Sequence, residues 1–316
     1  MTKFKRSDFK KIKTISVKNR KSKVRPSDFG KTFDGKRGLF KDFAESLPQI
    51  LVAEDLRKLV DDILASRKKR KPVILMMGAH VVKVGLAPII IDLMKNDIVT
   101  AVAMNSAAAI HDVETALWGQ TSEDVAVNLL DGTFGMARET GEFINGTLTE
   151  SHRKSDAGYG EALGERLLAE KAPNANVSIL AYCYANDIPV TVHAAIGTDI
   201  IHQQPTMNGA ATGELSFRDF QALSEICTQL TGGGVVLNVG SAVILPEVFL
   251  KALTVARNLG AKAKGFTTAV FDMNNHYRPT MNVRLRPTQD GGHGYYFVGH
   301  HEIMIPLLAA MIKAKK

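Results

Sequence analysis

Residues 71–118 read KPVILMMGAHVVKVGLAPIIIDLMKNDIVTAVAMNSAAAIHDVETALW, and this stretch decides the fold. Residues 73–77 are apolar at every position and too few for a helix, which is typical of a strand covered on both faces of a parallel sheet. Gly78 ends the run. Residues 86–95 fit a short helix, and residues 99–104 fit a second strand after a short connection. The stretch therefore predicts a strand–helix–strand unit of a parallel sheet.

The same alternation continues along the chain. Four further strands are predicted over residues 188–196, 234–239, 265–271 and 295–298. Between and after them we predict a polar loop over 203–213, a helix over 217–230 and a closing helix that starts at Pro306 and is capped by residues 300–302. Strands that alternate with helices favour one α/β domain with a Rossmann-like, doubly wound and mostly parallel sheet. Ligands of such sheets bind beyond the carboxyl ends of the strands, so loops 78–85 and 105–112 are the first candidates.

The composition is ordinary for a globular protein, with 316 residues of which 45% are hydrophobic and 23% charged. No apolar run reaches the roughly 18 residues of a membrane span, and no apolar core follows the basic start of the chain. Cys183 and Cys227 belong to no CxxC or zinc pattern. We therefore expect a cytoplasmic protein that makes no membrane contact.

The positive charge is concentrated at the start of the chain. Residues 1–37 hold 14 of the 40 Lys and Arg residues but only three of the 32 Asp and Glu residues. We therefore divide the chain into a basic arm over residues 1–44 and a single domain over residues 45–316. Such an arm suits a solvated or subunit-clasping segment, or a contact with a polyanion, and it lacks the interleaved aromatic residues of single-strand nucleic-acid sites.

Small and polar residues follow several predicted strands. They are Gly78, Asn105-Ser106, Gly197-Thr198-Asp199, Gly240-Ser241 and Thr267-Thr268. Small residues let a ligand approach the backbone, and the amides of a following helix can hold phosphate. The alternative is that these residues are simply good turn and cap formers. No GxGxxG or GxxxxGK[ST] string is present, so it is the whole set of turns that indicates a nucleotide or dinucleotide site.

Two of these loops also carry titratable side chains. The His111-Asp112 pair follows the second strand and suits a general base or a partner of sugar hydroxyls, with a pair on the helix surface as the alternative. Asp199 and His202 flank the next loop and suit recognition of a cationic or hydroxylated substrate. No third ligand has convincing spacing, so we predict no metal site there. His193 lies inside a predicted strand and is interpreted as a core residue.

From Gly78 onward the chain resembles the deoxyhypusine synthase family. Residues 89–117, IIIDLMKNDIVTAVAMNSAAAIHDVETAL, are similar to the family's helix, strand and TTGANxxHD turn. Residues 179–201, ILAYCYANDIPVTVHAAIGTDII, are similar to its SxxYWAxKNxIPVxxPAxTDGSxGD segment. Residues 267–272, TTAVFD, are similar to its NTAxxFDG motif. Order and spacing agree over roughly 230 residues, counted from Gly78 to the end of the chain.

The resemblance implies a Rossmann-like NAD-binding fold and a homotetramer, built as a dimer of dimers with active sites between paired subunits. It implies that Asp199 holds a substrate amine. It also implies that six residues approach NAD: Asn105, Ser106, Asp112, Thr268, Ala269 and Asp272. The small-residue turns add Gly78, Gly240 and Ser241 to the predicted cofactor site.

Two departures from the family pattern bear on the chemistry. The family's GGGVxKH turn is VGSAVILPEV here, with Pro246 at the histidine position. The segment that supplies the family's imine-forming lysine is replaced by HYRPTMNVRLRPTQDGGHG, and no lysine occurs from Ala269 to Ala310. Imine chemistry needs a desolvated amine, and Lys83 is the lysine to test in its place. The chain is therefore interpreted as a divergent relative of the family.

The leading prediction is an NAD-dependent enzyme that acts on a small amine or polyamine-like substrate by dehydrogenation and aminoalkyl transfer, as in homospermidine synthesis. His111 is the predicted proton-transfer group, and Asp199 with His202 completes the catalytic set. One alternative keeps the scaffold but performs lytic or hydrolytic chemistry on a nucleotide or sugar. The other is a non-catalytic binding or assembly protein whose basic arm meets an acidic partner.

Overall fold

The computed structural model describes residues 3–21 and 23–315 and divides the chain into two compact units between Glu54 and Asp55. In the first unit the described elements are the short turns η1 (Phe9–Lys11), η2 (Val17–Asn19) and η3 (Pro26–Asp28), and the helix α1 (Phe40–Ser46). None of the residues in these four elements is buried. The first unit therefore contributes no core of its own through these elements.

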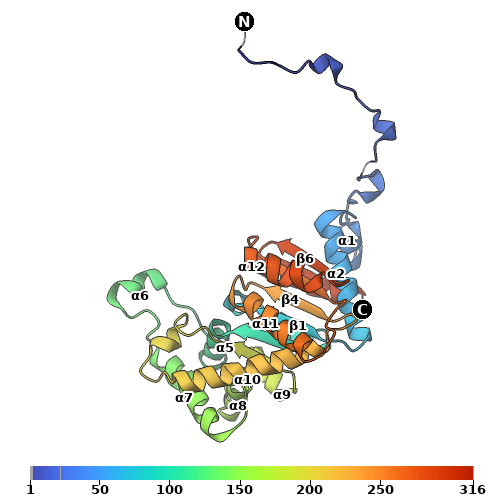
Figure 1. Cartoon of the computed structure of the whole chain (residues 1–316). Helices are drawn as coiled ribbons and strands as arrows, with labels where there is room; N and C mark the ends of the chain where they lie inside the picture. The colour runs from blue at the N-terminus through green and yellow to red at the C-terminus, as the bar shows by residue number, and fades with distance from the viewer. Residues whose placement is uncertain (1–2, 22, 316) are drawn as a thin grey trace. The chain divides into compact units, whose positions relative to one another are not determined.

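The second unit is built on a six-stranded parallel sheet (Figure 1). Its strands are β1 (Val73–Met77), β2 (Ala101–Asn105), β3 (Val190–His193), β4 (Val235–Val239), β5 (Thr267–Asp272) and β6 (His293–Val298). They lie in the order β3-β2-β1-β4-β5-β6, and every neighbouring pair is parallel. The winding reverses between β1 and β4, which is the point where ligands bind in open sheets of this kind. The predicted Rossmann-like, doubly wound α/β fold is confirmed.

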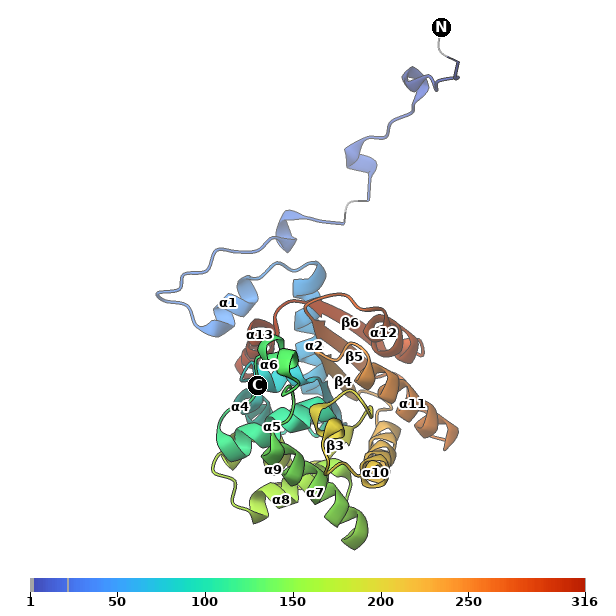
Figure 2. The ribbon, with the colours of Figure 1, turned by 90° about the vertical axis from the view of Figure 1, so that its left-hand side faces the viewer.

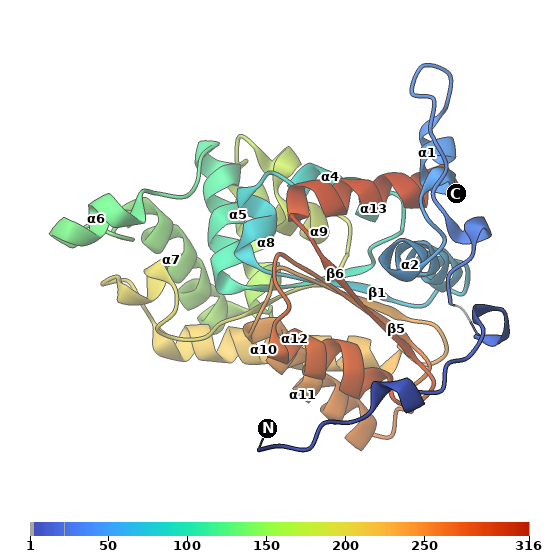
Figure 3. The ribbon, with the colours of Figure 1, turned by 90° about the horizontal axis from the view of Figure 1, so that it is seen from above.

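Helices cover both faces of the sheet, as the two turned views show (Figures 2 and 3). The longer helices are α2 (Leu51–Lys68), α4 (Ala87–Lys95), α5 (Ser106–Trp118), α7 (Arg138–Lys154), α8 (Tyr159–Ala169), α10 (Gly209–Thr228), α11 (Ile244–Asn258) and α13 (His301–Lys315). The shorter ones are α3 (Ala79–Lys83), α6 (Val125–Asp131), α9 (Ile179–Ala185), α12 (Tyr277–Pro279), η4 (Ala175–Val177), η5 (Ile200–Gln203), η6 (Thr280–Leu285) and η7 (Arg286–Thr288). The described helices include none with the length and apolar character that a membrane span requires.

The apolar runs of the sequence become the core because both faces of the sheet are covered. Every residue of β1, β4 and β5 is buried. On one face Ile74 and Met76 join Leu223 of α10 and Phe249 of α11 in one hydrophobic cluster. Figure 3 shows α4, α5, α9 and α13 on the opposite face. Strand β1 coincides residue for residue with its prediction, since an apolar run of this length has no other stable place.

Three predicted boundaries are wrong. Helix α10 starts at Gly209, inside the predicted loop, because Asn208 caps it by accepting a hydrogen bond from the Ala211 amide. Helix α13 starts at His301, so Pro306 lies inside the helix. Burial of Ile305 just before the proline favours this earlier start. Thr267 and Thr268 begin strand β5 and do not end it, so they lie at the sheet edge opposite to the one predicted.

Candidate functional site

The carboxyl ends of the parallel strands meet along one edge of the sheet, here called the carboxyl rim. Four of the five predicted turns lie along it: Gly78 after β1, Asn105-Ser106 at the end of β2, Gly197-Thr198-Asp199 after β3 and Gly240-Ser241 after β4. Asp272 ends β5 at the same rim. Thr267 and Thr268 lie at the opposite edge, the amino rim. The structure thus brings together most of the predicted turns.

The turns after β1 and β4 pack backbone against backbone at the point where the winding reverses. A Cβ atom at position 78 would come within 2.1 Å of the Gly240 carbonyl oxygen. Gly240 has a φ of +67°, in the left-handed region that favours glycine. The Gly78 amide donates to the Val239 carbonyl at 3.0 Å. Packing alone therefore requires glycine at both positions. This agrees with the alternative interpretation, in which the small residues are turn formers and need no ligand to explain them.

His301 adds a polar group to this place that the sequence did not single out. A Cβ atom at Gly240 would lie 2.7 Å from the His301 ring, and the centroids of the His301 and His80 rings are 5.7 Å apart. Nε2 of His301 lies 3.2 Å from the Phe271 carbonyl oxygen, so this nitrogen carries the proton and donates it. Nδ1 is then an acceptor, and it is buried with no hydrogen-bond partner among the described residues. Burial lowers the pKa of His301, which keeps the ring neutral.

Asp272 supplies a second acceptor at the same rim. Its carboxylate is buried, accepts from the Asn274 amide at 3.4 Å, and lies 3.5 Å from Nε2 of His276. Its negative charge acts on His301, where it opposes the effect of burial on the histidine pKa. Two acceptors, His301 Nδ1 and the Asp272 carboxylate, therefore lie near the glycine turns.

Asp199 lies in the loop after β3, and its carboxylate is almost removed from solvent, with 6% of the side chain exposed. Ser106, the first residue of α5, donates its hydroxyl to this carboxylate. The Thr198 hydroxyl donates at 3.3 Å. No lysine or arginine of the described chain forms an ion pair with Asp199. A buried carboxylate that is met only by hydroxyl groups and a histidine is well suited to a cationic ligand, because an uncompensated buried charge is costly.

His202 holds this loop in place. Its Nδ1 accepts from the Gly197 amide at 3.1 Å and the Asp199 amide at 3.2 Å, and lies 4.0 Å from the Asp199 carboxylate. The proton must then sit on Nε2, which is buried and has no partner in residues 3–21 and 23–315. In the same residues no group of three His, Cys, Asp or Glu side chains is placed to hold a metal ion. The ring of His202 therefore shapes the Asp199 loop and leaves one donor unsatisfied.

His111 is oriented by a chain of hydrogen bonds that starts at Glu114. Thr121 donates its hydroxyl to Glu114 Oε2 at 2.5 Å, so its oxygen accepts from Nδ1 of His111 at 2.6 Å. Thr140 donates to the other oxygen of Glu114 at 2.9 Å. This arrangement fixes the proton of His111 on Nδ1 and leaves Nε2 as a lone pair.

Burial and the neighbouring charges keep the His111 ring neutral. Burial, and next the positive charge of Lys83, lower the pKa of His111 to about 4, while the charge of Asp199 opposes them. The ring therefore lies within electrostatic reach of both Lys83 on α3 and Asp199. A neutral imidazole with a free Nε2 is the form that accepts a proton.

Three residues predicted to approach NAD lie inside the fold. Asp112 is fully buried and accepts from the Ser178 hydroxyl at 2.5 Å and from the amides of Ile179 and Leu180, so it caps α9. Burial raises its pKa to about 6. Thr268 donates to the Val283 carbonyl at 2.8 Å, and Ala269 is buried in the middle of the sheet. These contacts give the three residues structural roles, and their contact with a cofactor stays a prediction.

Asn105 and Ser241 also serve as helix caps. The side-chain oxygen of Asn105 accepts from the Ala108 amide at 3.0 Å and starts α5. The Ser241 hydroxyl accepts from the Leu245 amide at 3.1 Å at the start of α11. Both residues lie at the carboxyl rim, but their side-chain oxygens already have donors.

A buried polar group beside Asp199 was missed in the sequence. The Tyr159 hydroxyl is buried without a partner among the described residues, and burial, then Asp199, raise its pKa. The neighbouring Asp219 accepts from the amides of Val192 at 2.6 Å and Gly160 at 3.0 Å, and burial raises its pKa to about 8. The signal in the sequence was the Gly-Tyr-Gly string, since a Cβ at position 158 would lie 1.8 Å from an Asp219 oxygen. Tyr159 and His202 thus leave two unsatisfied donors near Asp199, as expected where a polar ligand binds.

Comparison with known proteins supports the fold and leaves the family open. No family model matches the chain, and no curated protein sequence matches it. A putative deoxyhypusine synthase from Entamoeba histolytica superposes with a TM-score of 0.52 at 13% identity, covering 89% of this chain and 96% of the other. A conserved putative LOR/SDH protein from Methanococcus maripaludis S2 gives a TM-score of 0.52 at 15% identity, covering 83% and 70%.

A further similar structure is the ternary complex of AgrE with ornithine and NAD+, with a TM-score of 0.53 at 14% identity. It covers 83% of this chain and 33% of AgrE, so the chain spans about a third of the length of that protein. At these identities the likeness establishes a shared fold. That fold is the α/β, Rossmann-like arrangement predicted from the sequence.

Proposed function

We propose that this chain is an NAD-dependent enzyme that oxidises a small amine, and that it is a divergent relative of the deoxyhypusine synthase family. The observation that carries the proposal is the nearly buried Asp199 carboxylate, which has no cationic partner in the described chain and shares its surroundings with the neutral His111. The strand order and the likeness to a putative deoxyhypusine synthase and to AgrE bound to ornithine and NAD+ support it.

The residues at the carboxyl rim fit a dinucleotide. Gly78 and Gly240 let the turns after β1 and β4 approach each other closely, and His301 Nδ1 and Asp272 are acceptors beside them that ribose hydroxyls could satisfy. Bound NAD would accept a hydride from the carbon next to the substrate nitrogen. The buried His301 Nδ1 has no hydrogen-bond partner among the described residues, so it is the atom at this rim that most needs a ligand.

In the proposed mechanism Asp199 binds the substrate ammonium, and Ser106 and Thr198 hold the Asp199 carboxylate in position. Nε2 of His111 takes a proton from the ammonium group, because an amine needs a free lone pair before its carbon can lose a hydride. Glu114, acting through Thr121, stabilises the imidazolium that forms. Loss of the hydride leaves a substrate iminium, whose carbon is attacked either by a second amine or by water.

The fate of the iminium decides between transfer and release. Attack by a second amine, departure of the first amine and return of the hydride would give aminoalkyl transfer, as in homospermidine formation. Attack by water and departure of the amine would give an aldehyde and leave the cofactor reduced. Lys83 lies at the end of α3 with an exposed side chain and acts electrostatically on His111, so it is the lysine to test as an imine former. Its exposure to solvent argues against this role, because an imine-forming amine must be desolvated.

The test is incubation of the full chain with NAD and a panel containing ornithine, arginine, putrescine and spermidine. With at least one amine we expect one of two results. Either reduced nicotinamide accumulates together with a product that lacks two hydrogens or its hydrolysis product, or mass spectrometry shows a transfer product without net cofactor reduction, because the hydride returns to it. Asp199→Asn should weaken the signal strongly, and Thr198→Ala, which removes only one of the hydroxyl donors of Asp199, should weaken it less. The proposal would be excluded if no amine of the panel gave either cofactor reduction or a product.

Hydrolytic chemistry is the second candidate, and the orientation of His111 favours it. A neutral imidazole with a free Nε2 activates water as readily as it deprotonates an amine. Formation of a hydrolysis product without any change in nicotinamide absorbance, lost in His111→Gln, would support this candidate over the first.

We also propose that the chain forms a homo-oligomer, and helix α6 is the surface that supports this. Figures 1 and 3 show α6 standing out from the body of the second unit. Its apolar side chains Val127, Leu129 and Leu130 are exposed, Leu130 to 89%. An exposed apolar helix of this kind marks an association surface. Light scattering should give the mass of a multimer, and of a tetramer when assembly is complete, for the natural chain and a smaller mass for Leu129→Ser/Leu130→Ser. An unchanged mass for this variant would exclude α6 as the association surface.

A further inference from the structure

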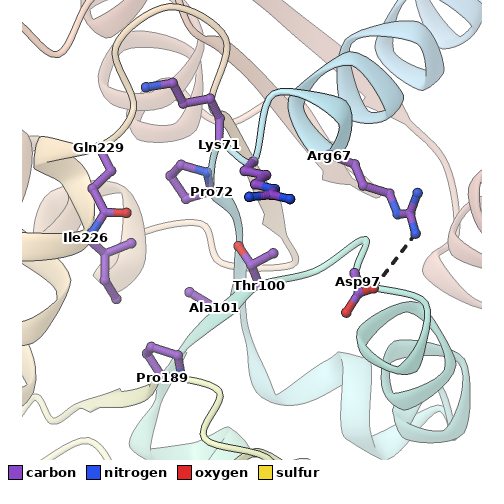
Figure 4. Close-up of a pocket in the computed structure, with 10 residues that line it drawn as sticks. Arg67, Lys71, Pro72, Asp97, Thr100, Ala101, Pro189, Ile226 and Gln229 are labelled. Carbon is purple, nitrogen blue, oxygen red and sulfur yellow. Dashed lines mark ion pairs between the residues drawn. The ribbon is translucent and has the colours of Figure 1, made fainter.

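We infer that a hollow at the amino rim binds a small organic phosphate, independently of the carboxyl-rim site. The hollow has a volume of about 560 Å³ and lies where the end of α2, the starts of β1 and β2 and the end of α10 meet (Figure 4). It is separate from the chemistry proposed above, because the strands that begin at this rim end at the other. The argument rests on the charges, the backbone and the apolar lining of the hollow.

The sequence places a run of five cations, Arg67 to Lys71, at the end of α2. The helix ends because Arg70 takes a φ of +52°, its amide donates to the Arg67 carbonyl at 3.0 Å, and the Lys71 amide donates to the Ser66 carbonyl at 3.0 Å. This turn brings Arg70 and Lys71 together with Arg67 into the lining of the hollow.

The charges of the hollow are only partly balanced. Arg67 lies 3.7 Å from the Asp97 carboxylate and donates from Nε to the Asn96 carbonyl at 3.2 Å, so these two opposite charges offset each other. Figure 4 shows Arg67 turned toward Asp97. The side chains of Arg70 and Lys71 make no hydrogen bond or ion pair in the described part of the chain. Two cations that line one hollow without a partner among the described residues indicate an anion with more than one charge.

The rest of the lining suits the body of an organic molecule. Ile226, Pro189 and Pro72 offer apolar surface, and the exposed Gln229 offers an amide (Figure 4). A guanidinium and an ammonium suit phosphate oxygens, and the apolar wall suits a base or an aliphatic chain attached to the phosphate. The arrangement therefore points to an organic phosphate and not to a bare inorganic anion.

Calorimetric titration of the full chain tests this inference with ATP, inorganic pyrophosphate and citrate as probes. We expect ATP to bind more tightly than pyrophosphate, both to bind more tightly than citrate, and all binding to weaken as salt is added. In Arg70→Gln/Lys71→Gln the affinity for ATP should fall at least tenfold. The matched control, Lys262→Gln/Lys264→Gln, removes the same charge from exposed lysines just before β5 and should bind ATP as the natural chain does.

Equal weakening in both variants would overturn the inference, because net charge and not the hollow would then be responsible. So would the absence of ATP binding, equal binding of ATP and pyrophosphate, or tighter binding of citrate. Titrations are repeated with saturating NAD to separate this hollow from the carboxyl rim. Loss of ATP binding when NAD is present would place the phosphate at the cofactor site and overturn the inference as well.

Discussion

The two rims of the sheet carry opposite chemistry. At the carboxyl rim the Asp199 and Asp272 carboxylates are largely buried, and among the described residues neither forms an ion pair with a lysine or arginine. At the amino rim Arg70 and Lys71 are solvent-accessible and form no ion pair with a described acidic residue. A parallel sheet makes this separation possible, because all strands begin at one edge and end at the other. An unpaired charge is therefore informative only together with its burial. The buried carboxylates indicate a preformed binding site, and the exposed cations indicate a site whose ligand exchanges readily with solvent.

The largest effect is expected for the proton acceptor of the carboxyl rim. His111→Gln keeps a hydrogen-bonding side chain but removes the basic Nε2, so turnover of the amine should fall roughly 10²- to 10⁴-fold, the usual contribution of a general base. Steady-state rates of nicotinamide reduction measure this. A matched change, His300→Gln, alters an exposed histidine and should leave the rate unchanged. Similar rates in the two variants would remove His111 from the mechanism.

The next effect concerns the amine clamp. Asp199→Asn preserves size and the contact with Ser106 but removes the charge, so kcat/KM should fall roughly 10- to 100-fold, as expected for a charged hydrogen bond of about 1.5–3 kcal/mol. The loss should appear mainly in KM for the amine and leave KM for NAD nearly constant. An equal rise in both constants would mean that Asp199 supports the loop and does not bind the amine.

A smaller effect is expected from the group that orients His111. Thr121→Val removes the hydroxyl between His111 and Glu114, so the rate should fall about tenfold, in line with the loss of one buried hydrogen bond. Thr115→Val removes a hydroxyl on the same helix that bonds only the His111 carbonyl, and should cost less. Equal losses in the two variants would show a general effect on α5.

The pH profile sharpens the same point. The folded protein holds the pKa of His111 at about 4, below its ordinary value, so the neutral, active form is present above that pH. The rate should therefore fall as the pH is lowered through about 4 and stay flat from there toward neutrality. The stability that this neutral group contributes should be lost earlier, as the pH falls from the ordinary pKa of 6.5 to about 4, because the unfolded state takes up the proton first. In Lys83→Gln the midpoint should move upward, since a neighbouring positive charge is removed. A midpoint that stays in place would contradict the placement of Lys83.

The smallest effect is expected at the amino rim. Arg70→Gln/Lys71→Gln should change amine turnover less than twofold, because these side chains lie at the opposite edge from the proposed chemistry. The rate assay under saturating NAD and amine measures this. A loss comparable to that of Asp199→Asn would show that the two rims are coupled and that the comparison between them is wrong.

Local patterns predicted most of the sheet. Val73–Met77 is apolar throughout and has only one stable place in a sheet covered by helices on both faces, so the strand and its burial followed from the residues. The turns at Gly78 and Gly240 followed as well, although their glycines are explained by mutual packing. The predicted strand over 265–271 starts only two residues before β5. Thr267 and Thr268 were nevertheless grouped with the residues that end strands, and the structure places them at the start of this strand.

The contacts of the site could not be predicted in the same way. Ser106 and Asp199 are 93 residues apart, and nothing local in either segment indicates the other. The same holds for His301 beside Gly240 and for Tyr159 beside Asp199. Asp112 has a contact that the sequence did not indicate either, since its carboxylate caps α9. Sequence patterns indicate which residues end strands, and only the packed chain shows which of their side chains remain free.

The central claim is that the dinucleotide and the amine share the carboxyl rim, and hydrogen–deuterium exchange of the full chain with and without NAD tests it most directly. We predict slower exchange in residues 78–83, 240–243 and 300–304 when NAD is bound, with added protection of residues 197–202 when the amine follows. Protection confined to residues 67–72 and 226–232, at the amino rim, would contradict the account.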